Sequence, residues 1–304
     1  MAWEYEGLFD VLPAEEGTLM DAFWKTEATA ARIESMAYRT RTTKAGTRLE
    51  AEVYPIFGRQ AEQTARAGRE RMTPERQQQL NTRRSKRWLV LLMENNFRVE
   101  EDIHVTLTYV GEEPDYPRVK KDVRNFLERI KRLREKRHLP DLKYIYAIGR
   151  DADQRIHCHC VMNGGIERDE LEEIWKKGNK RRKYKHGVAN AYRLQEYGKG
   201  LQGIANYLYK QNEKARDRGE RFHMHMWCAS KNLKRPRVRT SDTKMSNRKV
   251  KMIATNFQNM AKEIMERVYP GYSLEDCRVL FSDIVEGVYI RCVMRQNKKE
   301  GQRC

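Results

Sequence analysis

The sequence lacks any apolar run long enough to cross a membrane. The longest such run extends from Trp88 to Met93 and stops at Glu94, well short of the roughly 20 residues that a spanning helix needs. The first ten residues, MAWEYEGLFD, carry acids where a secretory signal would carry positive charge. We therefore expect a cytoplasmic protein with no membrane partner.

Cysteine is scarce, and two common nucleotide and metal motifs are missing. The six cysteines are scattered through 304 residues without a C-x-x-C pair, which argues against a disulfide scaffold and against the usual structural zinc site. A phosphate-binding loop of the form G-x-x-x-x-G-K-[ST] is also absent. No helicase is therefore evident in this chain, and unwinding of a duplex would need a partner.

Acidic residues are outnumbered, which indicates a polyanionic partner. The 61 lysines and arginines exceed the 43 aspartates and glutamates and give a formal net charge of +18, which favours nucleic acid. Any one basic run would more often be a solvated surface, so this prediction depends on the summed charge. The predicted nucleic-acid-binding residues are Arg181, Arg182, Lys183, Lys185, Lys231, Lys234 and Arg235. Tyr184, Trp175 and Trp227 are the aromatic residues available for base stacking.

The periodicity of apolar residues predicts an α+β fold. Alternation in DIHVTLTYVG (102–111) indicates a half-buried strand, and apolar residues three and four apart in 119–133 indicate an amphipathic helix. KYIYAIG and RIHCHCVMNG are predicted to form a β-hairpin through the polar turn RDADQ, so the sheet should be antiparallel. Strands and helices mixed without βαβ regularity favour the α+β class.

The other expected elements follow from capping and breaking residues. Pro74 after Thr73 predicts a helix start, and Pro236 predicts that the basic stretch 231–239 is irregular. We expect a basic loop at 176–186. The remaining predictions are a strand from Thr47, helices over 74–97, 167–177, 204–217 and 250–268, and strands in RVLFSDI and GVYIRCVM.

The stretch RIHCHCVM carries the first chemical signal. Strand alternation places His157 and His159 on one face and Cys158 and Cys160 on the other. Two imidazoles spaced in this way can bind one cation, while the cysteines pack as small apolar residues. A zinc site using all four would need both faces of the strand at once. Histidines that merely line a surface strand remain an alternative.

The second signal is the helix that contains Tyr207, Leu208, Tyr209 and Lys210. Tyr207 and Lys210 share a helix face, whereas Tyr209 points away from Tyr207. A tyrosine hydroxyl can attack a phosphodiester, and a nearby ammonium would stabilise charge on the phosphate. The alternative is that Tyr207 belongs to the core. A second H-x-H, His223 and His225, is predicted to be structural or to face DNA.

Together these motifs resemble those of the HUH endonucleases, specifically rolling-circle replication initiators of the phage gene-II-like type. HVTLTY, IHCHCVMN and IANYLYKQ occur in the family's order, and segments on either side extend the likeness beyond about Ala37. The resemblance implies an acidic extension at 1–36, a replication endonuclease domain at 37–295 and a basic tail at 296–304. The catalytic core would span about 86–240, and 241–295 would add C-terminal strands and a helix.

The same resemblance implies a fold and a mechanism. A central antiparallel sheet of about five strands, flanked by helices, would carry His157 and His159, which would hold Mg²⁺ or Mn²⁺. Tyr207, assisted by Lys210, would nick single-stranded or melted origin DNA of a phage, plasmid or mobile element. The implied partners are a host helicase and a polymerase in a bacterial cell.

One position departs from the family pattern. Relatives commonly supply a third metal ligand from the preceding strand, but Gly149 stands about there. Asp151, Asp153, Gln154 or water could replace it. The departure keeps open a non-catalytic DNA-binding protein with the same fold. A relaxase or single-tyrosine transposase would use nearly the same residues, and a zinc hydrolase is a further alternative.

Overall fold

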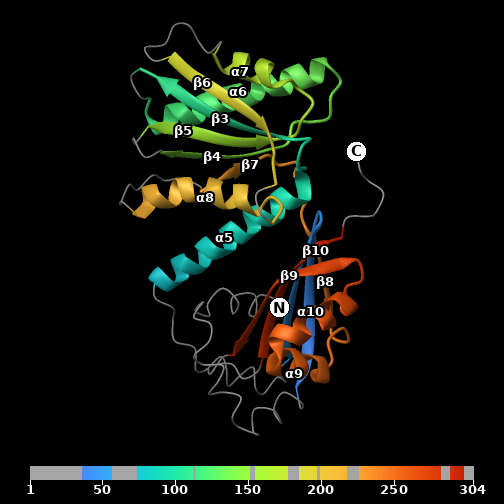
Figure 1. Ribbon diagram of the computed structural model, residues 1–304. Helices are drawn as coiled ribbons and strands as arrows, with labels where there is room; N and C mark the ends of the chain where they lie inside the picture. Colours follow the sequence, from blue (N-terminus) through green and yellow to red (C-terminus); the bar gives the residue numbers. More distant parts are fainter. Residues whose placement is uncertain are drawn as a thin grey trace. The chain divides into compact units, whose positions relative to one another are not determined.

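The chain folds into helices and antiparallel sheets. The computed structural model describes residues 36–56, 74–111, 114–150, 155–176, 185–196, 199–217, 226–281 and 288–297. These residues form six helices and two five-stranded antiparallel sheets (Figure 1). The predicted α+β class and an antiparallel five-stranded sheet are therefore confirmed, whereas the second sheet was not expected from the sequence.

The chain divides into two compact units. The central unit is residues 88–235, and the terminal unit combines residues 1–87 with 236–304. The division falls inside helix α5 (Pro74–Asn96), whose predicted extent agrees with the structure. The predicted extension at 1–36 lies outside the described residues except for Met36, and of the predicted tail only residues 296 and 297 are described.

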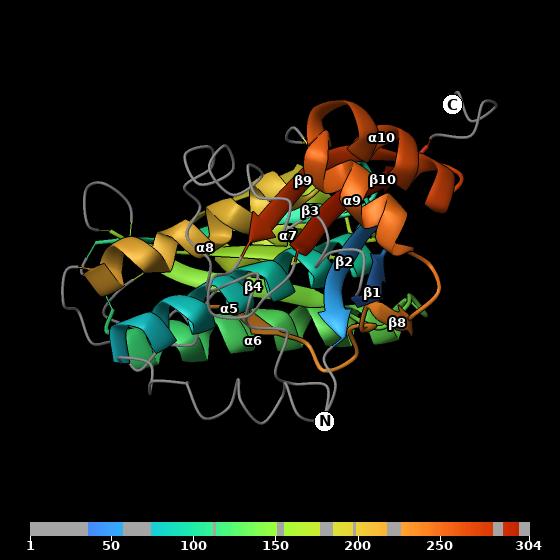
Figure 2. The same cartoon turned by 90° about the horizontal axis from the view of Figure 1, so that it is seen from below.

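The central unit contains one sheet with helices on both faces. The strand order is β6-β3-β5-β4-β7, and Figures 1 and 2 show α6 and α7 on one face and α8 on the other. The strands are β3 (Ile103–Val110), β4 (Tyr144–Arg150), β5 (Ile156–Met162), β6 (Lys185–Arg193) and β7 (Cys228–Ala229). The helices are α6 (Tyr116–Lys136), α7 (Arg168–Lys176) and α8 (Gln202–Asp217). The predicted β4–β5 hairpin pairing is confirmed.

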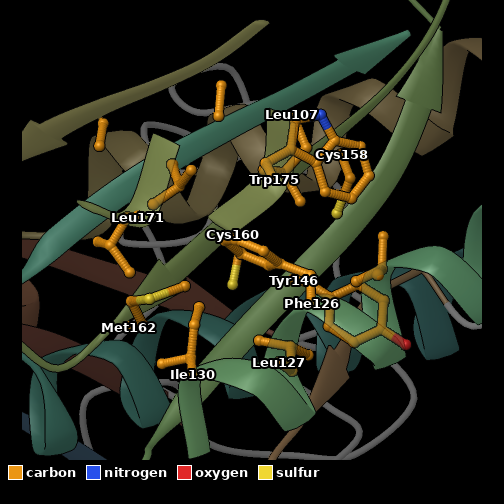
Figure 3. Close-up of a cluster of buried hydrophobic side chains, with 14 of the residues drawn as sticks. Leu107, Phe126, Leu127, Ile130, Tyr146, Cys158, Cys160, Met162, Leu171 and Trp175 are labelled. Carbon is orange, nitrogen blue, oxygen red and sulfur yellow. The ribbon is translucent and has the colours of Figure 1, made fainter. Parts of the chain in front are cut away.

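One face of this sheet packs against α6 and α7. Cys158 and Cys160 of β5 are fully buried there beside Phe126 and Trp175 (Figure 3), so the prediction that they pack as apolar residues is confirmed. Trp175 donates its indole N–H to the carbonyl of Thr108 at 3.0 Å. The prediction that Trp175 could stack on bases is therefore wrong, because its ring belongs to the core.

The other face is covered over β4 and β5. Leu208 and Tyr209 of α8 pack with Met93 of α5 against Ile145 of β4 and Val161 of β5. This second cluster anchors α8 across the sheet. Because α8 contacts β4, its exposed side chains lie near the part of β5 that carries the two histidines.

Strand β6 was not predicted, since the sequence indicated a basic loop at 176–186. Its inward residues are Gly187, Ala189 and Ala191, and they offer no bulky apolar alternation. They are small because α7 packs closely against this strand. At Gly187 a Cβ would lie 2.8 Å from Thr108 Oγ1, which is closer than real Cβ contacts allow.

The terminal unit is a second sheet with two helices on one face. Its strand order is β8-β1-β2-β10-β9. The strands are β1 (Ala37–Ala45), β2 (Arg48–Ile56), β8 (Arg237–Ser241), β9 (Tyr272–Phe281) and β10 (Val288–Gln296), and the helices are α9 (Asn247–Thr255) and α10 (Phe257–Val268). Leu49, Val53, Val250, Met265 and Ile290 are among the residues of its core.

Three expectations for the terminal unit need correction. Strand β1 was not predicted, and the stretch expected to be irregular forms β8 directly after Pro236. The single helix expected over 250–268 is two helices, because Asn256 adopts φ −141° and ψ 57° and ends α9. The predicted strands that correspond to β2, β9 and β10 are confirmed.

The face of β2 away from these helices holds a buried ion-pair network. Arg87 of α5 contacts Glu50 at 2.7 Å and Glu52 at 2.6 Å, and Arg48 and Arg291 also pair with Glu50. Burial alone would raise the pKa of Glu50, but the neighbouring guanidiniums outweigh it and lower the pKa to about 2. Glu50 therefore remains charged inside the protein.

Gly164, which follows β5, is expected to be sensitive to substitution. Its N–H donates to Asp102 at 2.8 Å, and an added Cβ would clash with the carbonyl oxygen of Glu101. We expect Gly164→Ala to lower the free energy of unfolding by about 3 kcal/mol, measured by urea titration. As a control, Gly111→Ala meets no atom within 4 Å and should cost about 1 kcal/mol through its positive φ alone. Equal losses would contradict the clash.

None of the helices in the described part of the chain is both long enough and apolar enough to span a membrane.

Candidate active site

Strands β3 and β5 bring polar side chains together on the face that α8 partly covers. Thr106 pairs with His159 in the register of the two strands, so His104 and Thr106 of β3 lie on the same face as His157 and His159 of β5. The rings of His157 and His159 are 4.7 Å apart. Both are buried, with 6% and 3% of their surface exposed.

Helix α8 adds a tyrosine to this group. The Tyr207 ring lies 4.8 Å from that of His159 in an edge-on arrangement, and 44% of its surface is exposed. Tyr209 is only 1% exposed and packs in the core. Lys210, one helical turn after Tyr207, is exposed. The structure thus gives Tyr207, and not Tyr209, access to both solvent and the histidines.

The hydrogen bonds of the two histidines determine which ring nitrogens are available. His157 Nδ1 lies 3.2 Å from the carbonyl oxygen of Arg155; since a carbonyl can only accept, Nδ1 carries the proton and Nε2 keeps its lone pair. His159 Nδ1 lies 3.2 Å from His104 Nε2 and 3.1 Å from Thr106 Oγ1. His159 Nε2 is buried and has no hydrogen-bond partner among the described residues.

Burial also controls the charge of these groups. It lowers the pKa of His159 to about 2, with smaller contributions from His104 and His157, and it lowers the pKa of His104 to about 4. Both imidazoles are therefore neutral near pH 7, which is the form that binds metals. Burial raises the pKa of Tyr207, so its phenol is protonated there.

The donor set fits a cation that keeps water in its coordination shell. Gly149 pairs directly with His157 in the hairpin and supplies no side chain. Asp151, Asp153 and Gln154 lie outside the described residues, and within the part of the chain that is described no three His, Cys, Asp or Glu side chains group as a metal site. Two neutral imidazoles, one with an orphaned Nε2, suit Mg²⁺ or Mn²⁺, which usually retain several waters.

Comparison with known proteins gives a match over this region. Residues 102–215 match the model of a family of replication-associated proteins, the ORF2 and gene II protein family. The matched segment begins just before β3 and ends within α8, so it contains all the site residues named above. It is less than half of the chain. No curated protein and no solved structure matches significantly. The similarity supports a role in replication, with DNA as the partner.

Within this replication-associated segment, sequence reasoning missed His104 and Thr106. The motif HVTLTY was interpreted as a strand without assigning a task to its polar residues. The signal was present, because His104 and Thr106 alternate with apolar residues and must share a face. Their contact with His159 depends on the pairing of β3 with β5, which alternation within one strand does not specify.

The predicted DNA-binding residues are only partly placed by the structure. Lys231, Lys234 and Arg235 are exposed and follow β7, at the sheet edge opposite β6. Lys231 lines a pocket with residues of α6, on the other face of the sheet from His159. Arg181, Arg182, Lys183, Tyr184, His223 and His225 lie outside the described residues, and so does the side chain of Lys185. Trp227 is partly buried against the core.

Proposed function

We propose that the protein is a metal-dependent HUH-type endonuclease that nicks and rejoins single-stranded DNA and so initiates rolling-circle replication of a phage, plasmid or mobile element. The observation that carries the proposal is the position of Tyr207, half exposed and 4.8 Å from the ring of His159. A solvent-accessible tyrosine beside two neutral histidines suits attack on a phosphodiester. The match to a replication-associated family supports DNA as the substrate.

The proposed reaction is a transesterification. Tyr207 Oη forms a bond to phosphorus as the bond from phosphorus to the 3′ oxygen breaks, and the phenolic proton leaves Tyr207 while the departing oxygen gains one. The products are a free 3′ hydroxyl, which can prime a polymerase, and a 5′ phosphotyrosine on the enzyme. Attack by a 3′ hydroxyl on the phosphotyrosine reverses the step and joins the strand.

Each residue has a distinct role in this scheme. His157 and His159 would hold Mg²⁺ or Mn²⁺ through Nε2, and the cation supplies polarisation of a nonbridging phosphate oxygen. His104 and Thr106 keep His159 oriented through its Nδ1. Lys210 would stabilise negative charge on the phosphate and on the phenolate.

Removal of either histidine should abolish metal binding. We expect His157→Ala and His159→Ala to weaken Mn²⁺ binding by at least about 100-fold, beyond the ~10–100-fold typical of lost supporting contacts, as measured by calorimetric titration. His138→Asn is the matched control, because His138 is exposed and its positive φ of 54° suits asparagine. Unchanged Mn²⁺ affinity in both site variants would contradict the metal assignment.

Adduct formation should become faster as the pH rises through the neutral range. The raised pKa of Tyr207 makes the phenolate the scarce species, and its fraction grows with pH. His159, with its pKa lowered to about 2, does not titrate in this range. Single-turnover rates at saturating Mn²⁺ and DNA measure the effect. A rate that declines from about pH 6 to about pH 8 would oppose attack by the phenolate.

One observation favours a second function. Gly149 supplies no ligand opposite His157, as expected of a non-catalytic DNA-binding protein that retains the fold. Such a protein would bind single-stranded DNA without forming a covalent adduct. A relaxase or single-tyrosine transposase would form the same adduct, and it would differ in the DNA sequences that it joins.

A further inference from the structure

A pocket opens beside the proposed catalytic group. It has a volume of about 370 Å³ and is lined by His104, Tyr192, Arg193, Leu194, Gln195 and Ile204. His104 connects it to the site, because its ring lies 6.5 Å from that of Tyr207 and its Nε2 contacts His159. Ile204 is three residues before Tyr207 on α8. A group held in this pocket would therefore lie next to the phosphate that Tyr207 attacks.

The lining combines an exposed aromatic ring, an apolar floor and a polar rim. Tyr192 is 58% exposed although it lies on a strand, whereas Leu194 and Ile204 are buried. Gln195 is exposed and carries both an amide donor and an acceptor. Arg193 is held in place because its guanidinium donates to the carbonyl of Glu100 at 3.1 Å.

The construction of β6 explains why this ring is exposed. The inward residues of β6 are glycine and alanine, and its outward residues, among them Val188 and Tyr192, are exposed. Strand β6 is at the edge of the sheet, and α8 contacts β4 on the far side of β5. The face of β6 is thus left open, with a tyrosine where core packing does not require one.

We propose that this pocket binds one unpaired nucleobase of the DNA strand, immediately beside the phosphodiester attacked by Tyr207. The base stacks on Tyr192, and the Gln195 amide contacts its edge. Stacking on an exposed ring is how single-stranded DNA is commonly held, and the volume lies at the small end of the roughly 300–1,000 Å³ range of ligand pockets. The position beside the cleaved bond rests on the proposed nicking function.

The first test measures binding and requires no cleavage. Fluorescence anisotropy with a labelled oligothymidylate single strand compares the wild type with Tyr192→Ala, Tyr192→Phe and Val188→Ala. We expect Tyr192→Ala to weaken binding about 5- to 150-fold, the equivalent of ~1–3 kcal/mol of stacking. Tyr192→Phe keeps the ring and should restore binding. Val188→Ala truncates an exposed residue of the same strand outside the pocket and should change affinity by less than about twofold.

The second test locates the base relative to the cut. Covalent adducts recovered from a randomised single-stranded pool are sequenced, and Gln195→Ala is expected to relax the base preference at one position next to the cleaved bond. Weak binding by Tyr192→Ala without any adduct in the wild type would support the pocket while removing the nicking function. Normal adducts together with unchanged oligothymidylate affinity in Tyr192→Ala would overturn the pocket and leave the nicking function intact.

Discussion

The Tyr207→Phe variant is expected to form no covalent adduct with DNA while it retains DNA and Mn²⁺ binding. The substitution removes only the hydroxyl that would bond to phosphorus, and loss of a nucleophile costs on the order of 10⁴-fold or more in rate. Denaturing electrophoresis of labelled single strands with Mn²⁺ measures the adduct. Because the Tyr207 ring is 44% exposed, the fold should tolerate the change.

Tyr209→Phe is the matched control on the same helix. Tyr209 is 1% exposed and packs in the core, so DNA cannot reach its hydroxyl without local unfolding. We expect this variant to form the adduct at close to the wild-type rate. An adduct retained in Tyr207→Phe and lost in Tyr209→Phe would exchange the two assignments. Loss in neither variant would indicate a nucleophile elsewhere.

The Arg87→Ala variant is expected to destabilise the terminal unit by about 3–5 kcal/mol. Arg87 contacts both Glu50 and Glu52, and these carboxylates are 1% and 3% exposed. Without the guanidinium, two neighbouring negative charges remain buried with less compensation. Urea unfolding followed by circular dichroism and by thiol accessibility measures the loss. A stability equal to that of the wild type would show that the network contributes nothing net.

The pH dependence of stability provides an independent check on this network. The pKa of Glu50 is lowered from its ordinary 4.5 to about 2 in the folded protein. Its contribution to stability is therefore complete above about pH 4.5 and is lost as the pH falls toward about 2. Arg87→Lys keeps a positive charge and should lose less stability than Arg87→Ala. The Arg87→Ala variant should also show a weaker decline in this acid range.

The predictability of each strand depended on the size of its buried side chains. Strands β3 and β5 carry bulky residues on their buried face, such as Ile103 and Leu107, and their alternation was visible in the sequence. Strand β6 buries only glycine and alanine, so it resembled a loop. The second sheet was hidden for another reason: β2 pairs with β10, whose residues lie more than 200 positions away, and local patterns carry no information about such pairing.

The candidate site was predictable where it depended on one element. Spacing along β5 separated His157 and His159 from the cysteines, and spacing along α8 separated Tyr207 from Tyr209. The contact of His104 with His159 was not predictable, because it depends on the pairing of two strands. Trp175 was misjudged because an aromatic residue in a basic region can face either DNA or the core, and here α7 directs it inward.

The buried cysteines make each unit report on its own opening. Cys158 and Cys160 are fully buried in the central unit, and Cys292 is fully buried in the terminal unit. Burial also raises the pKa of these thiols, so the folded protein should resist alkylation at all three. Their alkylation rates, resolved by peptide mass spectrometry, would give the opening free energy of the two units separately in one unmodified chain.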